Sequence, residues 1–162
     1  MHKRYTFHEK EVLYWEYRQY ASDALLPSIR VEYGPNIRFS DINAEALKQV
    51  IAWRDQYVGE LRSRKPGWDW IKEVEKYKRR PRRIELAIWV NSQLCGMAVG
   101  RVSDRRIVAS IHLLESNPAG NPLQGNIAII ATRWLEVFAK VISCKEIAIE
   151  RPEQKLIQFY RN

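Results

Sequence analysis

HLLESNPAGNPLQGNIAII, residues 112–130, is the stretch that decides the fold. It begins as an apolar, strand-like run, passes through a loop rich in Gly, Pro and Asn, and continues as a helical pattern directly after Gly125. A helix that follows a strand through a Gly-rich turn presents free backbone N–H groups and the positive end of its dipole. Because these two features together bind phosphate, the stretch predicts an anion site at the start of the helix.

Three strand-like runs surround the start of this stretch. They are RRIELAIWV (82–90), LCGMAVGRV (94–102) and RIVASIHLL (106–114), and the links NSQ and SDR between them are short enough for hairpins. The three runs therefore predict an antiparallel meander. The loop itself has neither the Lys of a Walker-type P-loop nor the G-x-G-x-x-G of a dinucleotide-binding fold.

An amphipathic helix and a further strand follow the loop. Apolar residues recur on one face of residues 126–142, which predicts a helix, and EIAIE (146–150) predicts a short strand. A strand, a long helix and a second strand form a crossover unit, so the strands over 106–114 and 146–150 should run parallel. Pro152 is predicted to start a last helix that continues through Asn162.

The N-terminal half reads mainly as helices, because strong helix formers and apolar residues at helical spacing dominate it. The expected segments are a helix over 7–25 ended by Pro27, extended chain over 29–42, a helix over 44–64 with Asn43 as its N-cap, and a helix over 68–79.

The composition is that of a folded globular domain. The chain has 162 residues, of which 46% are apolar and 28% are charged. This balance is too apolar for intrinsic disorder, and the length is typical of one domain. No apolar run approaches the roughly 18 residues of a membrane-spanning helix, and the N-terminus has no signal-peptide core. We therefore expect one soluble domain, located in the cytoplasm.

The chain carries a net charge of +8, from 27 Lys and Arg against 19 Asp and Glu. This excess favours an anionic partner without choosing between nucleic acid, an acidic protein and a phosphorylated small molecule. The densest run, KYKRRPRR, extends from Lys76 to Arg83. It reads as a solvated helix end or as the site of a tRNA or an acidic protein. Trp68, Trp70 and Tyr77 nearby could stack on bases, but their helical spacing is more often that of core residues.

The sequence does not indicate a catalytic cysteine, a disulfide or a metal site. Cys95 and Cys144 sit in apolar, strand-like runs without metal-ligand spacing, which favours buried free thiols over a disulfide or a zinc site. There is no cluster of metal ligands and no G-x-S-x-G nucleophile elbow. We therefore expect neither a metal-dependent nor a covalent mechanism.

The order of elements resembles that of the GNAT superfamily of acetyl-CoA-dependent N-acetyltransferases. Two stretches carry the resemblance: HLLESNP (112–118), similar to the end of the family's cofactor-contacting strand, and KLIQFYRN (155–162), similar to its late helical run. The resemblance implies an α/β (α+β) fold, a mixed sheet with an antiparallel meander, a crossover helix and a parallel strand. Residues 37–162 would form the acetyltransferase domain, and residues 1–36 an N-terminal helical extension packed on it within a single domain.

The resemblance also implies acetyl-CoA as the acetyl donor and assigns roles to individual residues. Glu115 would take the amine proton, directly or through a water, and Tyr160 would protonate the leaving CoA thiolate. The backbone N–H of Leu114 or Glu115 would polarise the thioester carbonyl. The implied cofactor-binding residues are Leu113, Leu114 and Glu115 along the strand, and Leu123, Gln124, Gly125, Asn126 and Ile127 at the pyrophosphate.

The chain departs from the family pattern in three places. The family loop, Q/R-x-x-G-x-G/A, overlays residues 122–127 with Gly125 kept, and Glu153 and Leu156 stand where an Asn and a small residue are usual. The family continues after the Tyr with closing strands, whereas this sequence ends at Asn162. Either the sequence is a truncated form or the helix over 7–25 covers the exposed sheet edge instead. An uncovered edge would favour a homodimer.

Each assigned residue also has a structural alternative. Glu115 reads equally as a solvated carboxylate at a strand end, and Tyr160 as an aromatic that packs the last helix on the sheet. His112 reads as a base, a cofactor contact or a satisfied interior histidine.

Three functions are compatible with these patterns. The leading one is an N-acetyltransferase that acts on a primary amine of an unidentified small molecule or protein. The others are a GNAT-type toxin that acetylates aminoacyl-tRNA and a catalytically silent GNAT-like binding module. The acceptor is not identified, because acceptor pockets are built from variable side chains.

Overall fold

The computed structural model describes residues 4–56, 69–151 and 156–161, and its six strands form one sheet. The strands lie in the sheet in chain order, and every neighbouring pair is antiparallel except β4 and β5, which run parallel. This confirms the predicted mixed sheet with its meander and crossover helix. The elements are α1 (Phe7–Tyr33), β1 (Ile37–Ser40), α2 (Ala44–Gln56), α3 (Trp70–Lys78), β2 (Arg83–Val90), β3 (Gln93–Val102), β4 (Val108–Ser116), α4 (Ile127–Val141), β5 (Glu146–Arg151) and β6 (Leu156–Arg161).

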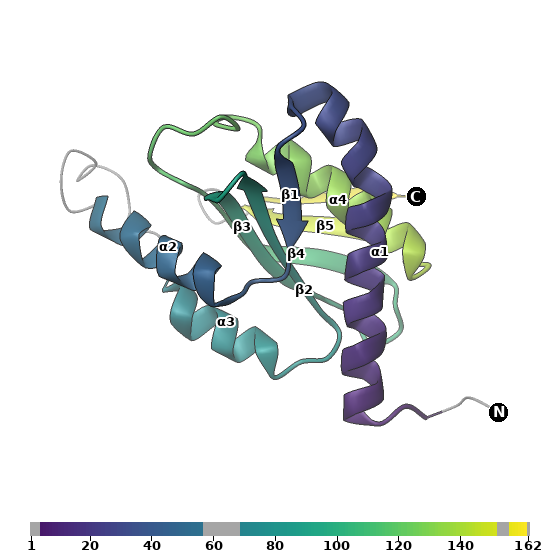
Figure 1. The fold of residues 1–162 in the computed structure, drawn as a ribbon. Coiled ribbons are helices and arrows are strands. Elements are labelled where there is room, and N and C mark those ends of the chain that lie inside the picture. The colour runs from purple at the N-terminus through teal and green to yellow at the C-terminus, as the bar shows by residue number, and fades with distance from the viewer. Residues whose placement is uncertain (1–3, 57–68, 152–155, 162) are drawn as a thin grey trace.

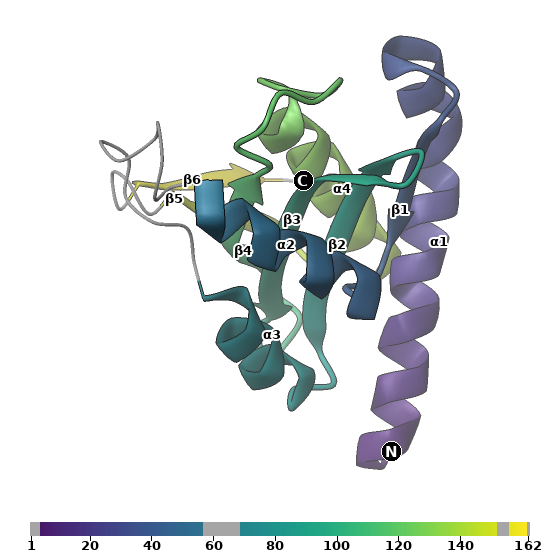
Figure 2. The same ribbon diagram turned by 60° about the vertical axis from the view of Figure 1, so that its left-hand side comes forward.

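Helices cover both faces of the sheet (Figures 1 and 2). On one face α2 and α3 pack through Trp53 and Trp70 against Trp89 of β2. On the other face α1 and α4 lie side by side and share a second core with the sheet. Alternating side chains of the central strands enter the two cores, as expected for a sheet buried on both faces.

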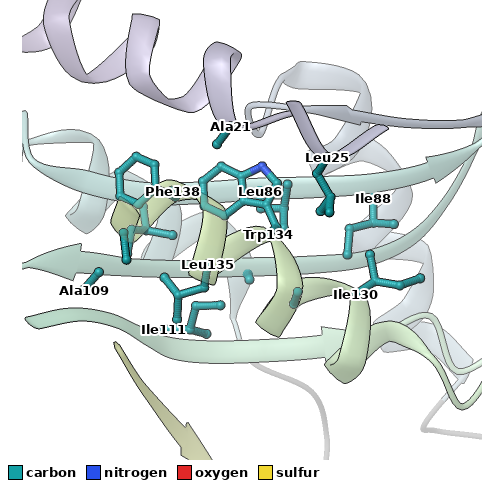
Figure 3. Packing of buried hydrophobic residues seen from close by; sticks show 14 of the residues in the cluster. Ala21, Leu25, Leu86, Ile88, Ala109, Ile111, Ile130, Trp134, Leu135 and Phe138 are labelled. Carbon is teal, nitrogen blue, oxygen red and sulfur yellow. The ribbon is translucent and has the colours of Figure 1, made fainter. Parts of the chain in front are cut away.

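Trp134 of α4 lies at the centre of the α1–α4 core (Figure 3). Its ring stacks on Phe138 with centroids 5.0 Å apart, and its indole N–H donates a 3.0 Å hydrogen bond to the hydroxyl of Ser22 in α1. Ala21 and Leu25 of α1 face the same region (Figure 3). The N-terminal helix is therefore part of the main core.

The first helix is longer than the sequence predicts. It begins at Phe7 but continues through Pro27 to Tyr33, so the predicted end at Pro27 and the extended chain over residues 29–33 are wrong. Pro27 is exposed, whereas the side chain of Ile29 is fully buried in the α1–α4 core. Burial of Ile29 therefore outweighs the backbone hydrogen bond that proline removes. The helix ends at Gly34, whose φ of 120° suits glycine.

Buried charges also fasten α1 to the sheet. Arg18, 2% exposed, donates to both carboxylate oxygens of Asp41 at 2.9 and 3.0 Å. Arg83 at the start of β2 binds Glu11 of α1 at 2.7 Å and also pairs with Glu85. Loss of one partner would leave a buried charge unpaired, so these contacts fix the position of the helix.

The helix predicted from Pro152 through Asn162 is wrong over residues 156–161, and its remaining residues lie outside the described part of the chain. Residues 156–161 form β6, which pairs antiparallel with β5 and places Tyr160 in register with Ile147. LIQFYR contains Ile157, Phe159 and Tyr160, which are residue types that favour strands, and β5 would otherwise end the sheet with an unpaired edge. Strand pairing therefore prevails. β6, and not the helix over 7–25, covers this edge, which overturns that expectation as well.

The remaining elements agree with the sequence within a few residues. Asn43 caps α2, because its side-chain oxygen accepts a 2.9 Å hydrogen bond from the N–H of Ala46. The predicted helix over 44–64 is observed as far as Gln56, and its remainder lies outside the described residues. Among the described helices, none has the length and apolar character needed to cross a bilayer.

A β-bulge in β4 interrupts its pairing with β3. Val99 pairs with Leu113 but Gly100 pairs with Ile111, so His112 is the extra residue. A bulge places two successive side chains on one face of the sheet. His112 accordingly contacts α3, and Leu113 lies in the α2–α3 core.

Gly100 permits this bulge, because a Cβ atom at this position would overlap the carbonyl oxygen of Ser110. We expect Gly100→Ala to lower the free energy of unfolding by about 1–3 kcal/mol, since the methyl group must displace backbone. Urea unfolding followed by tryptophan fluorescence measures the change. Gly120→Ala is the matched control, because a Cβ there meets nothing within 4 Å. Equal stability of the two variants would contradict the role of Gly100.

Candidate functional site

In the part of the chain that the structure describes, the second half of β4 has no strand beside it on the β5 side. β4 pairs with β5 only from Val108 to Ile111, although it continues to Ser116. Within the described residues, the two strands therefore separate at His112. Backbone N–H and C=O groups along a strand edge need partners, so this edge offers a row of hydrogen bonds to an extended ligand.

The N-terminus of α4 lies at the end of the loop that leaves this strand (Figure 1). Its N-cap Asn126 makes no side-chain capping bond, and the first turn contains no acidic residue. In the described part of the chain, the N–H groups of Ile127, Ala128 and Ile129 have no hydrogen-bond acceptor. Gly125, with φ of 86°, supplies the left-handed turn before the helix. An anion would complete this helix end.

Asparagine side chains hold the loop in a fixed shape. Asn117 donates to the carbonyl of Leu94 in β3 at 2.9 Å and accepts from the N–H of Ala119 at 2.9 Å. Asn121 accepts from the N–H of Leu123 at 3.0 Å and donates to two loop carbonyls. The loop conformation is therefore fixed without a ligand, which reduces the entropy lost on binding.

The structure divides the predicted cofactor-binding residues into two kinds. Leu123 and Ile127 are each 1% exposed in the α1–α4 core, and Leu113 is buried in the α2–α3 core. These three can offer a ligand only backbone groups. Gln124 and Gly125 are exposed, whereas Asn126, Leu114 and Glu115 are half-buried.

His112 is held by Tyr77 of α3. The Tyr77 hydroxyl lies 2.7 Å from Nδ1 of His112, and the two rings meet edge to face with centroids 5.8 Å apart. His112 is half-buried, and Tyr77 is 7% exposed. Of the three alternatives for His112, an interior histidine with one hydrogen-bonded nitrogen matches this geometry. The second ring nitrogen, Nε2, can still accept or donate a proton.

The surroundings disfavour a proton on His112. Burial lowers its pKa below the ordinary value of 6.5, and Glu150 of β5 opposes this effect. Three cations lower the pKa further: Arg101 of β3, and Arg80 and Lys76 from the α3 end of the basic run. The imidazole is therefore neutral at pH 7, the form that accepts a proton.

Glu115 lies further along β4 and is also contacted by α3. Its Oε2 accepts a 3.0 Å hydrogen bond from the indole N–H of Trp70, which is itself 3% exposed. This half-buried, hydrogen-bonded carboxylate differs from the solvated strand end that was the alternative for Glu115. α3 thus provides one wall of the site through the polar ends of two core aromatics.

Tyr160 lies on β6 instead of the predicted helix, with its backbone in register with Ile147. The basic run from Lys76 to Arg83 is at the opposite end of the sheet from the loop, as the strand directions predict. Several of its cations are tied to acids. Arg83 pairs with Glu11 and Glu85, Lys78 with Glu85 at 2.7 Å, and Arg79 with Glu75 at 3.5 Å.

Cys95 and Cys144 are buried and unbridged, as the sequence predicts. Burial raises the pKa of the Cys144 thiol to about 11 and also raises that of Cys95. A thiol of this kind is protonated at pH 7 and is a poor nucleophile.

The chain resembles solved structures, whereas no family model and no curated protein matches it. A transcriptional regulator from Bacillus halodurans C-125 is 13% identical over 74% of this chain and 84% of its own, with a TM-score of 0.53. Mycobacterium smegmatis RimJ, in complex with CoA-disulfide, is 17% identical over 72% of this chain and 63% of its own, with a TM-score of 0.50. An acetyltransferase from Streptococcus agalactiae 2603 is 16% identical over 74% and 75%, with a TM-score of 0.49. The chain has the fold of the GNAT acetyltransferases in divergent form.

Sequence reasoning did not find the partnership between α3 and β4. The expectation that Trp70 and Tyr77 are core residues at helical spacing is confirmed, and Trp68 lies outside the described residues. The hydrogen bond from Trp70 to Glu115 depends on the bulge, which no side-chain period reveals, and the one between Tyr77 and His112 joins segments that only the fold brings together. The nearest signal was the alternation of polar His112 with apolar neighbours on a buried strand.

The buried, neutral His112 makes stability depend on pH. Because its pKa is lower in the folded state, the unfolded chain binds more protons below pH 6.5, and stability falls as the pH decreases through this range. We expect the free energy of unfolding to fall more between pH 7.5 and 5.5 in the native protein than in His112→Asn, whose side-chain amide can still hydrogen-bond to the Tyr77 hydroxyl. Denaturant unfolding at both pH values measures the difference. His2 and His8 are present in both proteins, so their contribution cancels in the comparison. Equal pH dependence of the two proteins would contradict the role given to His112.

Proposed function

We propose that this protein is an acetyl-CoA-dependent N-acyltransferase that moves an acetyl group to a primary amine. One observation carries the proposal: within the described residues, β4 beyond Ile111 pairs with β3 but not with β5, and it leads through a fixed loop to an uncapped helix N-terminus. An extended thioester with a pyrophosphate at its far end would satisfy both features. The GNAT fold supports this choice, and the similar RimJ structure holds CoA-disulfide.

The cofactor would contact mainly backbone. Its pantetheine amides would hydrogen-bond along β4 at Leu113, Leu114 and Glu115, beyond Ile111, the last residue of β4 that pairs with β5. Its pyrophosphate would lie at the N-terminus of α4. The loop would contribute Leu123, Gln124, Gly125, Asn126 and Ile127, with Leu123 and Ile127 limited to their backbone because their side chains are buried.

The acetyl group would lie at the bulge, where β4 and β5 separate. The amine nitrogen attacks the thioester carbonyl carbon, the C–S bond breaks, and CoA leaves as a thiolate. A backbone N–H of Leu114 or Glu115 would stabilise the oxyanion. Tyr160 is the proposed proton donor to the thiolate, now from a strand instead of a helix.

His112 is our first choice to receive the amine proton, with Glu115 as the second. The imidazole is neutral, and a Tyr77 hydroxyl that accepts from Nδ1–H would leave Nε2 as the base. Glu150 of β5 would stabilise the imidazolium that forms. Glu115 already accepts a hydrogen bond from Trp70, so one of its carboxylate oxygens is partly occupied and less available to receive a proton.

Ala128→Asp tests the pyrophosphate site. Ala128 is exposed in the first turn of α4, where a carboxylate stabilises the helix dipole but repels a pyrophosphate. We expect acetyl-CoA to bind the native protein with micromolar affinity and Ala128→Asp at least about tenfold more weakly, a loss of about 1.4 kcal/mol. Isothermal titration calorimetry measures the affinity, and thermal unfolding should show unchanged or higher stability.

Ala128→Asn is the neutral control and should retain acetyl-CoA affinity. If the native protein fails to bind acetyl-CoA up to millimolar concentrations, the proposed function is wrong and the silent binding module is left. If the Asp and Asn variants bind equally well, the pyrophosphate lies elsewhere.

The choice of base can be tested by CoA release with a panel of polyamines, peptides and aminoacyl-tRNA. We expect His112→Gln to lower kcat by about 100-fold or more, the usual contribution of a general base, without changing acetyl-CoA affinity. Glu115→Gln should lower kcat less than His112→Gln does. Tyr160→Phe should also lower kcat, and raising the pH should not restore the activity of this variant. A larger loss in Glu115→Gln than in His112→Gln would exchange the two roles.

A further inference from the structure

Three cations gather beside the Tyr77–His112 pair. Lys76 precedes Tyr77 on α3, with its ammonium 5.9 Å from the Tyr77 ring centroid. The backbone N–H of Arg80 donates to the backbone carbonyl of Tyr77 at 2.9 Å. Arg101 of β3 is in register with Ser110, two residues before His112 on β4. All three side chains are exposed.

These cations differ from the others in the basic run. Lys78, Arg79 and Arg83 are each paired with an acid. Across the described ranges, Lys76, Arg80 and Arg101 make no ion pair. This difference between paired and unpaired cations matters, because a cation that is already paired with an acid contributes little to the binding of another anion.

Two carboxylates also face the pair. Glu150 of β5 acts electrostatically on both His112 and Tyr77, and Glu73 of α3 acts on Tyr77. The surroundings thus offer negative charge for an arriving ammonium and, a short distance away, positive charge for an anion. A ligand with both charges fits this arrangement better than a simple amine does.

We propose that the acceptor amine carries an anionic group, a phosphate or a carboxylate, which Lys76, Arg80 and Arg101 bind while the amine lies against His112. This inference rests on the proposed function and names the substrate class of the same site. The anion also has a catalytic consequence. The three cations lower the proton affinity of His112, and a bound anion offsets their field, so the acceptor itself strengthens the base that deprotonates it.

Sulfate is the first probe, because it remains a dianion across the titration range of histidine. NMR of the full chain follows the His112 imidazole, assigned with His112→Gln, while sulfate replaces chloride at constant ionic strength. We expect saturable shifts of the His112 signals and a titration midpoint that moves to higher pH. Absence of both effects would overturn the inference.

Arg101→Gln and Arg79→Gln form a matched pair. Both remove one exposed arginine of this end of the sheet, but Arg79 is paired with Glu75. We expect Arg101→Gln to weaken sulfate binding about fivefold, the scale of an exposed charge, and Arg79→Gln to leave it unchanged. An equal loss in both variants would indicate diffuse attraction of a polyanion to the whole basic surface and would also overturn the inference.

The same His112 signals distinguish the two anions. O-phosphoethanolamine and β-alanine should bind more tightly than ethanolamine, and the tighter of the two identifies phosphate or carboxylate. If ethanolamine binds as tightly as O-phosphoethanolamine and β-alanine, the inference that the acceptor carries an anionic group is wrong. Calorimetry with acetyl-CoA on the same sample keeps the two proposals apart. Binding of acetyl-CoA without a sulfate effect rejects only this inference, whereas a sulfate effect without acetyl-CoA binding rejects the proposed function.

Discussion

The bulge at His112 is the constraint on which the site depends. Without it, regular alternation from Ile111 would keep His112 toward α3 but would turn Leu113 and Glu115 toward α4, so Glu115 would lose its contact with Trp70. With it, Leu113 and Glu115 share the α3 face with His112, which lies one residue after the pairing of β4 with β5 ends. The same local irregularity therefore turns the side chains and coincides with the separation of the strands. Only glycine at position 100 lets β3 approach this closely.

The N-terminal helix contributes to the same arrangement from the far side of the sheet. α1 shares its core with α4 through Ser22 and Trp134, so it helps to fix the helix whose N-terminus forms the proposed anion site. Arg18 and Arg83 join α1 to the beginning of β2 and the segment after β1. α1, which belongs to the N-terminal extension expected over residues 1–36, thus acts as a structural layer of the domain.

Sequence patterns predicted the elements whose signals are local. The meander and crossover follow from apolar periods and short links, and Gly125 marked the loop that precedes α4. The pattern LIQFYR is compatible with a helix or a strand, and only the unpaired edge of β5 decides between them. Pro27 failed as a helix end because Ile29 is buried, and the Tyr77–His112 contact joins positions 35 residues apart in the chain. Such outcomes depend on tertiary packing, which local patterns do not contain.

Charge is distributed unevenly between the two ends of the proposed site. At the α4 end the first helical turn has no charged side chain of its own, so a pyrophosphate there would be held by backbone N–H groups and the helix dipole. At the opposite end of the sheet, formal positive charges gather around Tyr77 and His112. Added salt screens exposed charges more strongly than hydrogen bonds from a fixed backbone. The cofactor would then be recognised by shape and hydrogen bonding and the acceptor by charge, so the excess of Lys and Arg in this sequence concerns the acceptor more than the cofactor.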